Sequence, residues 1–222
     1  MADGENRRLA TCAIIGWAVF LLMLVMVLTG QSSWIDQFAP NLRQWGSGSS
    51  FLFESVRDLT ALGGVFLRLV VAALAASMLF IFGYRYRALV LAAAVLSGWL
   101  ANSLLKLVVG RARPDPAFQM MDAIGNSFPS GHSFNGAVLW ISLAALVAPL
   151  LKHPAARKLL WWACIITSLG IGWSRLWLGV HYPTDSIAGV FGGAAWAMTF
   201  ILCARIFQMK ATSVSSDEPS SH

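Results

Sequence analysis

Six long apolar runs alternate with short polar segments along the chain. Each run approaches the roughly 20 residues that an α-helix needs to cross a bilayer. The first run follows Arg7 and Arg8, as in a secretory signal, but its apolar core is long and no small-residue cleavage site follows it, so it is interpreted as an uncleaved helix. The pattern predicts six membrane-spanning helices, at about residues 9–30, 61–83, 88–110, 133–151, 158–178 and 184–207.

The longest polar interval, residues 31–60, carries two shorter amphipathic patterns. Two short helices lying on the outer membrane surface are expected there, either as a rim packed on the bundle or as a gate for substrate. Their apolar positions recur at helical spacing, at Trp34, Phe38, Leu42 and Trp45 and again at Leu52, Val56, Leu59 and Leu62.

These patterns predict an all-α integral membrane bundle of six transmembrane helices, with short amphipathic helices in the first outer loop. Residues 1–210 are expected to form a single domain. Residues 211–222 are rich in serine and hold Asp217, Glu218 and Pro219, a composition typical of a disordered tail.

The composition supports a membrane protein. Hydrophobic residues make up 57% of the chain and charged residues 12%, about half the charged share of a soluble protein. The net charge of +6 does not indicate a nucleic-acid partner, because the basic residues flank apolar runs. The three cysteines lie inside apolar runs, so no disulfide framework is expected.

Lysines and arginines predict the orientation in the membrane. Two short links, Tyr84–Arg87 and Lys152–Lys158, are strongly basic, and such links stay on the cytoplasmic side. Both termini are therefore expected in the cytoplasm, in a multi-pass protein of the cell membrane, with a bacterial inner membrane as the expected setting.

With this orientation, three polar stretches lie together at the outer ends of the helices. They are Lys106–Pro114, Pro129–His132 and Ser174–Asp185. Ser130 is placed to cap the helix that follows, and the backbone amides of a helix start attract anions. The third stretch ends near the outer start of the last helix.

The residues in these stretches suit phosphate chemistry. Lys106, Arg113 and Arg175 supply three positive charges for a phosphate group. Ser130 adds a hydroxyl, and Gly131 lets the backbone approach closely.

Two histidines supply the reactive groups. Asp185 follows His181 by one helical turn, so its carboxylate can bind one ring nitrogen and leave the other as a nucleophile. His132 has no neighbouring carboxylate in the sequence and is the better candidate for the proton donor to the leaving oxygen.

The three stretches together resemble the motifs of the type 2 phosphatidic acid phosphatase (PAP2) superfamily, K-x6-R-P, P-S-G-H and S-R-x5-H-x3-D. Every motif position and internal spacing is present, from Lys106 to Pro114, Pro129 to His132 and Ser174 to Asp185. The resemblance covers about residues 50–207 and matches the family's membrane branch.

The resemblance implies a metal-independent lipid phosphatase without a cofactor. It implies a phosphohistidine on His181, with His132 protonating the leaving group and later activating water. It assigns phosphate binding to Lys106, Arg113, Ser130, Gly131 and Arg175. The implied substrates are isoprenyl pyrophosphates, phosphatidic acid, phosphatidylglycerol phosphate or lipid A phosphates, approached from the periplasmic or exterior face; the motifs do not choose among them or define an oligomeric state.

Two other functions remain open at this point. The same phosphohistidine would serve a phosphotransferase that passes phosphate to a second lipid. A non-catalytic carrier of anionic lipids would use the basic residues only for binding, but it leaves the spacing of His181 and Asp185 unexplained.

Several charged residues fall outside the motifs. Arg68 lies within the second apolar run, where snorkelling or an internal polar partner is favoured over catalysis. For Arg111, contact with a lipid headgroup and contact with substrate are equally consistent with the sequence. The spacing of Glu54, Asp115 and Asp122 has no metal-ligand logic, so no metal site is expected.

Overall fold

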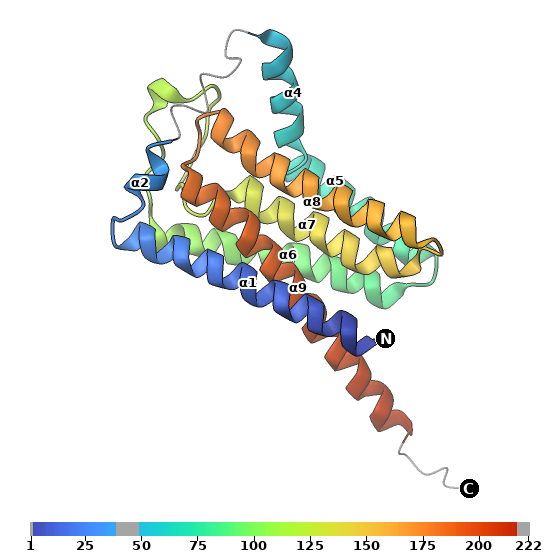
Figure 1. The fold of residues 1–222 in the computed structure, drawn as a ribbon. Coiled ribbons are helices and arrows are strands. Elements are labelled where there is room, and N and C mark those ends of the chain that lie inside the picture. The colour runs from blue at the N-terminus through green and yellow to red at the C-terminus, as the bar shows by residue number, and fades with distance from the viewer. Residues whose placement is uncertain (1, 39–48, 217–222) are drawn as a thin grey trace, which may run out of the picture.

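A computed structural model describes residues 2–38 and 49–216 of the chain, and all regular structure in these ranges is helical. The long helices run roughly along one direction, so the molecule is an elongated bundle (Figure 1). The elements are α1 (Ala2–Leu28), α2 (Ser33–Asp36), α4 (Ser50–Ala61), α5 (Val65–Ile81), α6 (Arg85–Val109), the 3₁₀ turn η1 (Pro116–Phe118), α7 (Gly131–Val147), the 3₁₀ turn η2 (Ala148–Leu150), α8 (Pro154–Trp177) and α9 (Pro183–Ser216).

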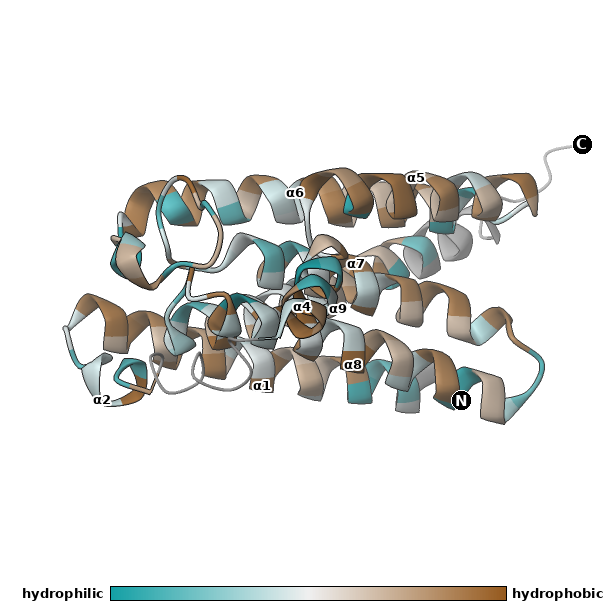
Figure 2. Cartoon of the chain, turned by 90° about the horizontal axis from the view of Figure 1, so that it is seen from above, coloured by the Kyte–Doolittle hydropathy of each residue, from teal (hydrophilic) through white to brown (hydrophobic). Residues whose placement is uncertain are grey.

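Five helices in the described residues are long and apolar enough to cross a membrane: α1, α6, α7 with η2, α8 and α9. The shorter α5 passes the same test only together with α4, and the two meet at a bend of 50°. The predicted all-α membrane fold is confirmed, whereas the count of six spans depends on how the bent pair is treated and stays a prediction. Much of α5 and α6 is hydrophobic (Figure 2), and Ile81 and Val108 in these helices are largely exposed, as expected for contact with lipid.

Helix α7 lies in the middle of the bundle, and its neighbours are α5, α6, α8 and α9. Its buried residues include Phe134 and Leu139 on opposite sides of the helix. At Gly193 of α9 a Cβ atom would lie 2.1 Å from the carbonyl oxygen of Phe134, so only glycine allows α9 to pack this closely on α7.

Helices α1 and α9 are packed together along much of their length (Figure 1). One close approach is at Gly16, where a Cβ atom would lie 2.9 Å from the Cβ of Ala195. The ends of the described chain and the α5–α6 and α7–α8 links lie at one end of the bundle, and the three motif stretches lie at the other. The side of the membrane that each end faces stays a prediction.

Two boundaries differ from the predictions. Helix α1 begins at Ala2 instead of about residue 9, because the polar residues before the apolar run continue the helix. Helix α9 continues to Ser216, so residues 211–216 are helical instead of forming a disordered tail; residues 217–222 lie outside the described part.

The first outer loop is only partly described. Helix α2 is a single turn, and most of the first predicted amphipathic segment falls in residues 39–48, outside the described chain. The second segment is α4, which begins at a capping contact from the Leu52 amide to the Ser49 hydroxyl. Val56 of α4 packs against Trp177 and Leu178, so α4 is fixed on the end of α8.

Candidate active site

His181 and Asp185 come together at the start of α9. The His181 Nδ1 atom lies 3.5 Å from Asp185 Oδ2, and the Ser127 hydroxyl lies between them, 3.2 Å from Nδ1 and 2.5 Å from Oδ2. Both side chains are essentially buried. The predicted turn-spaced pair is present, and Ser127 links its members; no motif spacing pointed to Ser127.

The other ring nitrogen of His181 faces a cation. Arg113 Nη1 lies 3.0 Å from His181 Nε2, and because a guanidinium only donates hydrogen bonds, Nε2 must accept and Nδ1 must carry the ring hydrogen. Arg113 is held by the carbonyl oxygens of Ile124, Gly125 and Val180. The Nε2 lone pair of His181 is therefore turned toward a fixed guanidinium, beside which an anion would be stabilised.

Burial lowers the pKa of the His181 ring to about 3, and the charges of Arg113 and Arg175 act in the same direction, whereas Asp185 opposes them. The unoccupied ring is therefore neutral at physiological pH, as a nucleophilic nitrogen must be. Burial also lowers the pKa of Arg113, which stays charged.

The second motif lies at the N-terminus of α7, beside Lys106. Ser130 is the N-cap residue, but its hydroxyl accepts a hydrogen bond from Ser133 at 2.8 Å instead of capping a helical amide. A Cβ atom at Gly131 would lie 3.5 Å from both Lys106 Cε and Asn102 Oδ1, so the two α6 side chains border the helix start.

The predicted phosphate-binding cations converge on this helix start. Lys106 donates to the carbonyl of Asn126 at 2.5 Å, which bends it toward the site, and it interacts electrostatically with Arg113 and Arg175. Arg175 is buried, and its Nη1 donates to Thr60 of α4 at 3.0 Å. Its Nε atom has no hydrogen-bond partner in the described residues, and neither has Nδ2 of the buried Asn102.

His132 lies in the first turn of α7 and interacts electrostatically with Arg175, His181 and Arg113. The structure thus brings all eight predicted site residues to one end of the bundle: His181, His132, Asp185, Lys106, Arg113, Ser130, Gly131 and Arg175. Their roles in a reaction are taken up below.

Arg111 joins the first outer loop to the start of α9. Its guanidinium joins two carboxylates, Asp185 at 2.6 Å and Asp36 of α2 at 2.5 Å, and stacks 4.3 Å from the Tyr182 ring. Burial opposes its charge, but the two carboxylates raise the pKa of Arg111 overall. The sequence left the role of Arg111 open and did not indicate these ion pairs, because Asp36 lies 75 residues away along the chain.

For Arg68, the sequence favours snorkelling or an internal polar partner, and the structure contradicts the first of these. The residue is 3% exposed, so it does not snorkel, and its Nε atom has no hydrogen-bond partner among the described residues. It interacts electrostatically with His132. No pattern in the sequence distinguishes such a residue from a snorkelling one.

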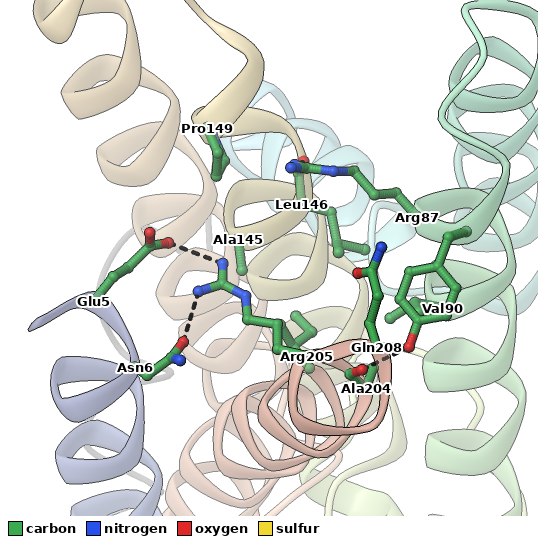
Figure 3. A pocket seen from close by; sticks show the side chains of 12 residues that line it. Glu5, Asn6, Arg87, Val90, Ala145, Leu146, Pro149, Ala204, Arg205 and Gln208 are labelled. Atoms are coloured by element: carbon green, nitrogen blue, oxygen red, sulfur yellow. Dashed lines mark hydrogen bonds and ion pairs between the residues drawn. The ribbon is translucent and has the colours of Figure 1, made fainter. Parts of the chain in front are cut away.

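A separate cavity of about 380 Å³ lies at the opposite end of the bundle, among α1, α6, α7 and α9. Its polar groups are engaged in helix-to-helix contacts: Arg205 binds Glu5 and Asn6, and the Tyr86 hydroxyl donates to the Ala204 carbonyl (Figure 3). Arg87 reaches the Leu146 carbonyl at 2.5 Å. These contacts tie the helices together, and none of the motif residues lines this cavity.

No group of three or more histidine, cysteine, aspartate or glutamate side chains in the described ranges is arranged to hold a metal ion. The positive groups at the motif end are instead the side chains of lysine and arginine.

The chain is also similar to known proteins. The model of the PAP2 superfamily matches residues 87–209. The lipid A 1-phosphatase of Rhizobium etli is 39% identical over 121 residues, which are 50% of this chain and 47% of that protein. The undecaprenyl-diphosphatase BcrC of Bacillus subtilis is 34% identical over 99 residues, 43% of this chain and 46% of that protein. The chain spans about half the length of the curated relatives it matches.

One solved structure has the same fold. The crystal structure of a transmembrane PAP2-type phosphatidylglycerolphosphate phosphatase from Bacillus subtilis gives a TM-score of 0.76, at 23% sequence identity. The match covers 88% of this chain and 96% of that one.

Proposed function

Because the chain belongs to the PAP2 superfamily, we propose that it is a membrane phosphatase that removes a phosphate group from a lipid through a phosphohistidine on His181. The observation that carries the proposal is the orientation of the His181 ring. Its Nε2 lone pair faces Arg113, while Nδ1 is turned toward Ser127 and Asp185.

In the first step, a phosphate group binds between Arg113, Arg175, Lys106 and the N-terminus of α7. His181 Nε2 attacks the phosphorus, and the bond from phosphorus to the lipid oxygen breaks. The protonated ring of His132 gives its proton to the leaving oxygen. Asp185, through Ser127, stabilises the positive charge that the His181 ring acquires.

In the second step, water attacks the phosphorus of the phosphohistidine. His132, now neutral, takes a proton from the water, and the nitrogen–phosphorus bond breaks, which returns His181 to its starting form. The three cations offset the charge on the phosphate oxygens throughout, so the reaction proceeds without a metal ion.

The substrate class rests on the relatives. Their names specify lipid A, phosphatidylglycerophosphate and undecaprenyl diphosphate, so the substrate of this chain is a lipid phosphate or diphosphate in the membrane. The basic links support a site on the periplasmic or exterior face.

The test is release of inorganic phosphate from a panel of purified lipid phosphates in detergent containing EDTA. The panel holds phosphatidic acid, phosphatidylglycerol phosphate, lipid A and a polyprenyl diphosphate. Wild-type protein is expected to release phosphate from at least one of them and His181→Ala from none. Phosphate found on a second lipid instead of in solution would indicate a phosphotransferase, and no turnover of any panel member would overturn the proposal.

A further inference from the structure

Arg68 of α5 is a buried cation without a partner in the described chain. Its side chain makes none of the hydrogen bonds or ion pairs found for Arg111, Arg113 and Arg175, and its Nε atom is enclosed and unsatisfied. Residues 39–48, outside the described ranges, contain no aspartate or glutamate. Burial of an unpaired charge is costly, so a cation in this position indicates an anion that the described residues do not supply.

The geometry of α5 directs Arg68 toward the catalytic end. Its backbone amide donates to the Gly64 carbonyl at 3.1 Å, so Arg68 lies one turn after Gly64 on the same face. Helical side chains point toward the N-terminus of their helix, so that of Arg68 extends back over the Gly64 turn.

Gly64 leaves room beside the ring of His132. A Cβ atom at Gly64 would lie 3.5 Å from His132 Nε2, in ordinary van der Waals contact. The electrostatic interaction between Arg68 and His132 agrees with this placement. Arg68 therefore reaches the side of the site occupied by His132, whereas Arg113 contacts His181.

We propose that Arg68 binds negative charge on the leaving-group side of the site. The inference rests on the proposed function, in which His132 protonates the leaving oxygen. When the leaving group is itself a phosphate, as in a diphosphate ester, its remaining oxygens carry charge after the terminal phosphorus–oxygen bond has broken. The Arg68 guanidinium binds those oxygens while His132 supplies the proton.

This role makes Arg68 a determinant of substrate class. Esters whose leaving group carries a phosphate gain a charge-assisted contact that neutral alcohols do not gain. A hydrogen bond to a charged group accounts for a difference of about 10- to 100-fold in kcat/KM between the two classes.

The test compares farnesyl diphosphate with farnesyl monophosphate, which differ only in the second phosphate. Arg68→Gln is expected to lower the ratio of kcat/KM for diphosphate over monophosphate by about 10- to 100-fold, and Arg68→Lys to lower it less. Arg57→Gln is the control, because Arg57 is half exposed on α4 and paired with Glu54, and it should leave the ratio unchanged. Taking a ratio within one preparation cancels any loss of folded protein.

A second measurement uses competing anions. Inhibition by inorganic pyrophosphate should weaken in Arg68→Gln much more than inhibition by inorganic phosphate. A ratio and a pyrophosphate inhibition that both stay within twofold of wild type would overturn the role of Arg68 alone. Wild-type protein inactive on both esters and on the lipid panel would instead overturn the proposed function.

Discussion

The surroundings of the His181 ring determine its protonation state. An exposed histidine is partly protonated near neutral pH, whereas burial and two nearby arginines keep this ring neutral. In the proposed reaction, the ring could therefore attack without first losing a proton.

A titration tests this state. Burial lowers the pKa of His181 to about 3, so in the unoccupied protein its nitrogen-15 signals should keep the neutral pattern, with the hydrogen on Nδ1, from pH 7 down to pH of about 5. The pKa of His181 in the folded protein lies below that of an unfolded histidine, so the unfolded state binds more protons at pH values between the two pKa values. The contribution of His181 to the free energy of unfolding therefore decreases as the pH falls through this range. His181→Gln identifies the signal, and a midpoint near 6.5 would contradict the prediction.

The contribution of His132 to the rate is expected to depend on the leaving group of the substrate. General acid catalysis contributes about 10²- to 10⁴-fold, and a lipid alkoxide needs the proton far more than nitrophenolate does. Single-turnover phosphorylation by His132→Ala should therefore fall most with phosphatidic acid and least with nitrophenyl phosphate. An equal loss on both, together with turnover by His181→Ala, would require the two assignments to be exchanged or abandoned.

Among the helical elements, α2 is small but is joined directly to the catalytic end. Asp36 accepts hydrogen bonds from the Thr184 amide at 3.1 Å and from Arg111. Arg111 in turn binds Asp185. The single turn of α2 therefore positions the start of α9 without contacting the reacting atoms.

Asp36→Asn tests this connection. It leaves Arg111 with one carboxylate instead of two, so the free energy of unfolding should fall by about 1–3 kcal/mol. Activity should also fall, mainly in kcat, because Asp36 contacts Arg111 and Thr184 instead of the side chains proposed to bind phosphate. Asp58→Asn is the matched control, since its side chain is 77% exposed, and a change of no more than about 0.5 kcal/mol is expected there. Equal effects of the two substitutions would contradict the role of Asp36.

The contact between α7 and α9 gives a second prediction at this scale. Gly193→Ala would place a methyl group against the Phe134 carbonyl, two residues after His132. The helices must move apart, so the unfolding free energy should decrease by about 1–3 kcal/mol and phosphatase activity should fall. Gly4→Ala, with no atom within 4 Å of the added carbon, serves as the control. Thermal unfolding in detergent measures the stability of both variants. An unchanged unfolding free energy for Gly193→Ala would show that the contact is not tight.

For the whole molecule, the separation of the motif end from the basic links predicts the orientation. Cysteines introduced at Asp122 and at His153 should react differently with a membrane-impermeant reagent applied outside intact cells. We expect labelling at 122 and none at 153. The reverse pattern would place the motif end in the cytoplasm.

Much of the fold follows from sequence because apolar runs and motif spacings are local. Runs of apolar residues predicted the long helices, and the spacing from His181 to Asp185 predicted their contact. The contacts of Arg111 could not be predicted in this way, because Asp36 and Asp185 approach it from distant segments. The state of Arg68 depends on three-dimensional burial, which hydropathy along one helix does not reveal.

The pairing of α1 with α9 also has a consequence for biosynthesis. The two helices stand at opposite ends of the described sequence, yet Gly16 and Ala195 are in close contact. A nascent chain inserts α1 into the bilayer long before the ribosome has made its partner, so α1 has only lipid against that face in the meantime. His181 and Asp185 emerge with the same late segment, so an unfinished chain lacks both this pair and the final packing of its bundle.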